Sequence, residues 1–147
     1  YNHPQRSPFM MYRALWVRFP LDIDYLNEAA SYLVGEHDFA SFCKMSSQNG
    51  STKRYIEKAE FVRCESLVTF IIKGNAFLHN MIRIIIGTLV SMNGNDEPVD
   101  KIKRLIELRD RNKSGVTAPP YGLYLQSIDY SPSLVEMNNR NTINTVT

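Results

Sequence analysis

The sequence has few cysteines, no long apolar run and little net charge, and each of these absences excludes a class of protein. Cys43 and Cys64 are the two cysteines among 147 residues, too few for a disulfide framework or a cysteine-based metal site. No apolar run is long enough to span a membrane, and no signal-peptide pattern precedes the cysteines. The formal charge of +2 does not by itself argue for a nucleic-acid partner. We therefore expect a soluble, cytoplasmic protein without a metal. Any basic surface must be confined to a small part of the molecule.

The residues that are present suffice for one globular domain with a core. Of the 147 residues, 44% are hydrophobic and 11% aromatic, and no segment is repeated. We assign residues 1–130 to this domain, because residues 131–147 collect Asn, Thr and Ser and predict a disordered polar tail. The sequence opens on YNHP without an initiator methionine, and a strand-like stretch follows almost at once. We therefore expect the natural protein to extend upstream.

Two kinds of pattern predict strands. Residues 11–19 and 122–130 alternate between apolar and polar side chains, as strands with one exposed face do. Residues 54–63 and 67–73 are joined by a short turn and predict a hairpin. The chain therefore predicts four strands.

Helical spacing of apolar residues predicts three helices, which follow Asp22, follow Asn75 and open at Pro98. The side chains of Asp22 and Asn75 can each cap the free amide groups of a first turn, and proline is favoured in a first turn. Between the helices, residues 36–52 and 114–120 lose periodicity and predict surface loops.

The predicted order is strand, helix, strand, strand, two helices, strand. This order predicts an α+β fold of the ferredoxin-like, split βαβ kind, an antiparallel four-stranded sheet with helices on one face. Such sheets serve RNA-binding modules, enzymes and oligomerisation domains, so the fold alone fixes no activity. The open face could carry Tyr12 and Trp16, which would either stack on RNA bases or pack against a neighbouring domain.

The helix after Asn75 carries one residue that does not fit a core. Most of its positions are apolar, except for a stripe at four-residue spacing that consists of His79, Arg83, Gly87 and Ser91. An arginine on an apolar helix must either reach water or bind an anionic partner. One turn further on, Gly87 lacks a Cβ and would let another segment approach closely.

Three blocks of sequence, in this order, resemble a known family. They are residues 35–42 (GEHDFASF), residues 74–83 (GNAFLHNMIR) and residues 118–125 (APPYGLYL). In order and spacing they resemble the C-terminal half of the tRNA pseudouridine synthase A family. Because three blocks agree, the resemblance is more specific than any single motif.

The resemblance implies an isomerase that converts uridine in the anticodon stem-loop of tRNA to pseudouridine, with no cofactor or metal, as a homodimer whose RNA site spans both subunits. The family's nucleophile is an aspartate in a Gly-Arg-Thr-Asp-Ala-Gly block, which this sequence lacks. A base-stacking tyrosine of the family also lies upstream, and Tyr1 does not match it. We therefore expect that the N-terminal domain is absent and that this chain alone is inactive.

The same resemblance nominates site residues. Arg83 resembles the family's active-site arginine, the partner that keeps the aspartate ionised and oriented. Leu123 resembles an apolar residue of the base pocket, and His79 and Asn80 are further candidates for substrate binding. For His79 a structural hydrogen bond explains the residue at least as well. Asp38 we interpret as part of a loop anchored in the core.

A second hypothesis from another class stays open. The chain could be a non-catalytic module that binds RNA or oligomerises and has kept the fold without the chemistry. An upstream reading frame with a Gly-Arg-Thr-Asp block would favour the enzyme, and a start codon just before Tyr1 would favour the module.

Overall fold

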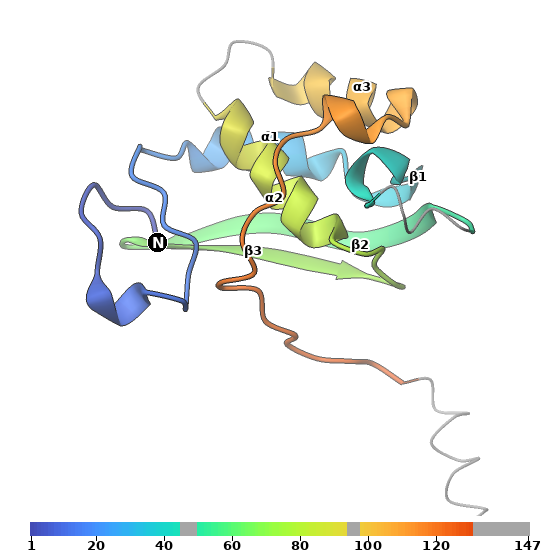
Figure 1. Ribbon diagram of the computed structural model, residues 1–147. Helices are drawn as coiled ribbons and strands as arrows, with labels where there is room; N and C mark the ends of the chain where they lie inside the picture. Colours follow the sequence, from blue (N-terminus) through green and yellow to red (C-terminus); the bar gives the residue numbers. More distant parts are fainter. Residues whose placement is uncertain (45–49, 94–97, 131–147) are drawn as a thin grey trace, which may run out of the picture.

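The computed structural model describes residues 1–44, 50–93 and 98–130 (Figure 1). The described part is an α+β fold, with a three-stranded antiparallel sheet in the order β1-β2-β3. Figure 1 shows the helices on one face of this sheet. The helices and strands are α1 (Ile23–Ser31), β1 (Gly35–Asp38), β2 (Lys53–Cys64), β3 (Leu67–Gly74), α2 (Met81–Met92) and α3 (Pro98–Leu108). The predicted tail at residues 131–147 lies outside the described residues.

The predicted hairpin is confirmed, and it is the longest part of the sheet. Strands β2 and β3 pair from Cys64↔Leu67 to Ile56↔Gly74. Strand β1 covers only the first positions of β2, from Asp38↔Lys53 to Gly35↔Ile56. Beyond it, Asn27 of α1 bonds to the free edge of β2, where its side chain accepts from the Phe61 amide (2.6 Å) and donates to the Phe61 carbonyl (3.0 Å). A helix side chain thus replaces a neighbouring strand for one residue.

Helices α1 and α3 begin as predicted. Asp22 caps α1, because its carboxylate accepts from the Tyr25 amide at 3.1 Å, and α3 opens at Pro98. The prediction for α2 is wrong at its start. The Asn75 side chain accepts from the Tyr55 amide at 3.0 Å and extends the hairpin instead of capping a helix, and α2 starts at Met81.

The core lies between the helices and the inner face of the hairpin. Leu26 of α1, Ile56 of β2, Ile85 and Leu89 of α2 and Ile102 of α3 are fully buried in one cluster. Apolar burial of this kind is the main favourable term in folding, at about 25 cal/mol per Å². None of the helices in the described residues has the length and apolar character needed to cross a lipid bilayer.

The prediction of a four-stranded sheet is wrong for the described residues. Residues 11–19 form no strand, because a 3₁₀ turn at Pro8–Met10 directly precedes them and a left-handed backbone at Tyr12 (φ 60°) interrupts them. One isolated bridge, Asn2↔Val17, is the only pairing found there in the described part. Residues 122–130 form no strand either, although an ion pair of 3.2 Å joins Asp129 to Lys73 of β3. Since the ferredoxin-like plan depended on four strands, it stays a prediction.

Candidate functional site around Arg83

A loop crosses α2 at a distance that only glycines permit. A Cβ on Gly87 would lie 1.8 Å from the carbonyl oxygen of Val116, and one on Gly115 would lie 2.7 Å from the Cα of Thr88. Thr88 holds the crossing, because its hydroxyl donates to the Ile84 carbonyl (2.7 Å) and accepts from the Gly115 amide (2.9 Å). The close approach predicted at Gly87 is therefore confirmed, and the loop after α3 is fixed across the middle of α2.

The next residues of that loop orient Arg83, on the first turn of α2. The Ala118 amide donates to the Arg83 carbonyl (3.0 Å), and Arg83 Nε donates back to the Ala118 carbonyl (2.7 Å). Nη1 of Arg83 donates to Oδ1 of Asn80 at 2.9 Å. Within residues 1–44, 50–93 and 98–130, no acidic side chain forms an ion pair with Arg83, and its Nη2 has no hydrogen-bond partner. The half-buried guanidinium of Arg83 is therefore oriented by two neutral groups, the Ala118 carbonyl and the Asn80 side chain, which do not balance its charge.

Arg83 and Leu123 line the same pocket, which we call the Arg83 pocket. Its volume is about 430 Å³, and its lining residues come from residues 1–21, from the hairpin, from α2 and from residues 118–124. Most of the lining is apolar and includes Leu15, Phe70 and Ile86. A cation beside an apolar cavity of this size can bind an anion and a flat ring next to each other.

The two other predicted substrate-binding residues lie at the N-terminal end of α2. Asn80 sits in the left-handed region (φ 62°), which asparagine tolerates, and its side chain supports Arg83 rather than capping the helix. His79 is exposed and is not part of the pocket lining, and its carbonyl accepts from the Lys44 amide at 3.3 Å. The structure therefore brings Arg83, Asn80 and Leu123 together, but not His79.

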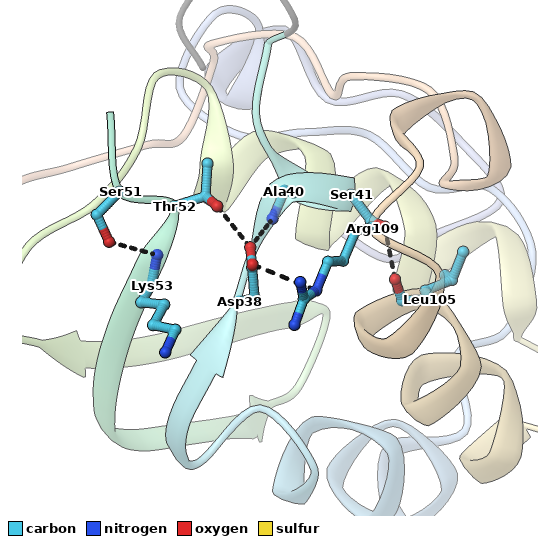
Figure 2. A network of polar contacts seen from close by, with 8 residues as sticks. All are labelled: Asp38, Ala40, Ser41, Ser51, Thr52, Lys53, Leu105 and Arg109. Carbon is cyan, nitrogen blue, oxygen red and sulfur yellow. Dashed lines mark hydrogen bonds and ion pairs between the residues drawn. The ribbon is translucent and has the colours of Figure 1, made fainter. Parts of the chain in front are cut away.

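Asp38 lies outside the Arg83 pocket, and its carboxylate is bound by other residues of the chain (Figure 2). Its carboxylate accepts from the Ala40 amide (3.1 Å) and from the Thr52 hydroxyl (2.5 Å) and pairs with Nε of Arg109 (3.3 Å). The same view shows Ser41 donating to the Leu105 carbonyl at 2.5 Å. These contacts join the end of β1 to the residue before β2 and to the residue after α3, and they agree with the interpretation of Asp38 as a structural residue.

The buried free thiol of Cys43 is not suited to a catalytic role either. Burial raises the pKa of the Cys43 thiol, and the positive charge of Arg54 offsets this only in part, so the thiol is a poor nucleophile. No cluster of three or more His, Cys, Asp or Glu side chains that could hold a metal occurs in the described ranges.

Sequence reasoning missed two parts of the site. The backbone of Ala118 orients Arg83, and a backbone contact has no side-chain signature, although the APP run marks a rigid segment there. Arg13 also lines the pocket. The alternation over residues 11–19 predicts a regular strand and gives no reason to single out Arg13.

Comparison with known proteins identifies the family. A family described as tRNA pseudouridine synthase matches residues 29–131. A tRNA pseudouridine synthase A of Brachyspira hyodysenteriae is 46% identical over 106 residues, 72% of this chain and 43% of that protein. One of Francisella tularensis subsp. mediasiatica is 40% identical over 130 residues, 88% of this chain and 50% of that protein. The chain spans about half the length of these curated relatives. The resemblance predicted from the three blocks is thus confirmed: the chain belongs to the tRNA pseudouridine synthase family.

Proposed function

We propose that this chain supplies the C-terminal half of a tRNA pseudouridine synthase, an isomerase that converts uridine to pseudouridine in the anticodon stem-loop. The single observation that carries the proposal is Arg83, a guanidinium held at an apolar pocket in a chain of this family. On this proposal residues 1–130 form the C-terminal domain, the N-terminal domain lies outside the chain, and the whole enzyme is a cytoplasmic homodimer that needs no cofactor or metal.

The reaction explains what the pocket would do. The N1–C1′ bond of uridine breaks, the base turns, and a C5–C1′ bond forms, while C5 loses a proton and N1 gains one. These steps require a positioned carboxylate, a surface that holds the detached base, and exclusion of water. Leu123 and the apolar lining would hold the base, extruded from the RNA stack.

Arg83 would hold the carboxylate. Its Nη2 is available among the described residues, and a charge-assisted bond from a guanidinium keeps a carboxylate ionised and aimed. The described residues that line the pocket include no Asp or Glu. We infer that the nucleophilic aspartate comes from an upstream half and that this chain alone is inactive.

Tritium release tests this proposal. The substrate is an unmodified tRNA transcript labelled at uridine C5, which loses its tritium when the C5–C1′ bond forms. We expect release by the protein translated from the complete reading frame around this sequence, which we call the complete product, and none by the 147-residue chain. Mapping the pseudouridines by primer extension after carbodiimide treatment would place them in the anticodon stem-loop.

The alternatives give different results. Release by the 147-residue chain alone would contradict the half-enzyme proposal, because the nucleophile would then lie within these residues. No release by either protein, together with tRNA binding by the complete product, would favour the non-catalytic RNA-binding module. This second candidate is supported by one observation: no Asp or Glu lies among the described residues that line the pocket.

A further inference from the structure

Three exposed tyrosines gather where the Arg83 pocket opens. Tyr121 and Tyr124 belong to the pocket lining, and Tyr12 meets Tyr121 edge to face with ring centroids 5.0 Å apart. The exposed fractions are 69% for Tyr12, 43% for Tyr121 and 70% for Tyr124. We call these residues the tyrosine patch. Aromatic rings this exposed gain little from burial in the described chain, so their placement needs another explanation.

The chain holds Tyr12 in an unfavourable conformation. Its φ of 60° lies in the left-handed region, where a bulky side chain is rarely found. The turn around it is fixed by the amides of Arg13 and Ala14, which both donate to the Met10 carbonyl, at 3.1 and 3.2 Å. The Tyr124 hydroxyl also donates to the Arg13 carbonyl at 2.9 Å. Backbone strain that presents an exposed ring is characteristic of ligand-binding sites.

The surroundings of the patch carry positive charge. Arg13 and Arg83 are the charged side chains among the described residues that line the pocket. Neither of the segments that carry the patch, residues 1–21 and residues 111–128, contains an Asp or Glu. A surface of aromatic rings and arginines without carboxylates is complementary to single-stranded nucleic acid, whose bases stack and whose phosphates are anionic.

We propose that the tyrosine patch binds an unpaired nucleotide next to the target uridine, with its base stacked on Tyr12 and its phosphate on Arg13. This inference rests on the proposed function, which places the target base in the adjacent pocket. Stacking tolerates any base, since every base has a π face. The patch therefore sets affinity for RNA rather than the rate of the chemical step, and its loss raises KM while kcat stays unchanged.

The test compares matched variants of the complete product. Tyr12→Gly removes the ring and suits the left-handed backbone, whereas Tyr12→Phe keeps the ring. Tyr55→Ala, on β2 and away from the pocket, is the control for loss of an exposed tyrosine. Arg18→Gln, an exposed arginine outside the pocket lining, is the control for Arg13→Gln.

Two quantities are measured, the Kd for an unmodified tRNA transcript over a salt series and steady-state tritium release. We expect Tyr12→Gly to raise both Kd and KM about 10-fold, with kcat unchanged. Tyr12→Phe and both controls should match wild type. Arg13→Gln should weaken binding and reduce the slope of log K against log salt by about 1.

The outcomes separate this inference from the proposed function. If wild type releases tritium but Tyr12→Gly binds tRNA as wild type does, the patch proposal is wrong and the isomerase stands. If tRNA binding depends on Tyr12 but neither the wild type nor any variant releases tritium, the isomerase proposal is wrong and the RNA-binding patch stands. A Tyr12→Gly variant with a lower Tm and an unchanged Kd would show that another protein segment covers the ring, which also overturns the patch.

Discussion

The two sides of the Arg83 pocket are built in different ways. One side, the frame, consists of the hairpin β2–β3 and helix α2. The other side, the walls, consists of residues 1–21 and 114–124, which contain no helix or strand beyond one short 3₁₀ turn. In the frame, Ile85 and Leu89 are fully buried, whereas in the walls Leu123 is 48% exposed. The frame is therefore stabilised mainly by apolar burial. The walls, apart from the buried Val17, Leu21 and Ala118, are held by a few polar contacts and by close backbone approach.

Because of this difference, the stability of the fold and the geometry of the site depend on different parts of the molecule. Arg83 has its backbone in the frame and its guanidinium bound to the walls through Ala118. The frame can fix the position of the Cα, but Ala118 in the walls, together with Asn80, decides where the charge points. Changes that move the walls should therefore affect the site more than they affect the hairpin.

The largest effect on the walls is expected from Gly87→Ala. In a helix interior this change normally stabilises by about 1 kcal/mol, but here the new Cβ would overlap the Val116 carbonyl. We expect a net loss of about 2 kcal/mol in the free energy of unfolding in urea. Hydrogen exchange should show faster exchange at residues 115–123 and unchanged protection in the hairpin. Ser91→Ala, at an exposed position of α2, is the control; a stabilised Gly87→Ala protein would contradict the account.

A smaller effect is expected from Thr88→Val, which keeps the shape of a buried side chain and removes its hydroxyl. The Gly115 amide then loses its acceptor, at a cost of about 1–2 kcal/mol. The loss should appear in urea unfolding and again as faster exchange in the walls. Wild-type stability together with wild-type exchange would show that this hydroxyl does not hold the crossing.

The smallest effect is expected from Tyr124→Phe. The hydroxyl that bonds to the Arg13 carbonyl is exposed, so water can replace it, and we expect a change within about 0.5 kcal/mol. Urea unfolding measures this change. A loss of unfolding free energy as large as that of Thr88→Val would mean that the walls are stabilised mainly by contacts with each other. Their contacts with α2 would then not be what fixes them.

The hairpin and helix α1 could be predicted from the sequence because local patterns specify them. The hairpin follows from two β-branched and aromatic runs, and α1 follows from apolar spacing behind the Asp22 cap. The start of α2 could not be read, because Asn75 can equally cap a helix or bond to a strand, and only the position of Tyr55 decides between them. Strand β1 could not be predicted, because a glycine followed by three polar residues forms a strand only through pairing with β2.

The walls could be predicted only in part. The alternation in residues 11–19 fits an extended segment, but a single residue in the left-handed region, Tyr12, prevents a ladder, and alternation does not reveal it. For the site, Gly87 indicated a crossing, and the three blocks indicated Arg83 and Leu123, which do share one pocket. Their chemical roles stay predictions, because no contact within the chain tests them.

Tritium release by Arg83 variants of the complete product shows whether the Arg83 guanidinium takes part in the reaction. We expect Arg83→Ala to lower kcat by about 10²–10³-fold. We also expect Arg83→Lys, which keeps the charge but loses the guanidinium geometry, to be impaired. Arg104→Ala, an exposed position of α3, should release tritium as wild type does. An Arg83→Ala protein with the wild-type kcat would contradict the account, because the guanidinium that the walls orient would then have no part in the reaction.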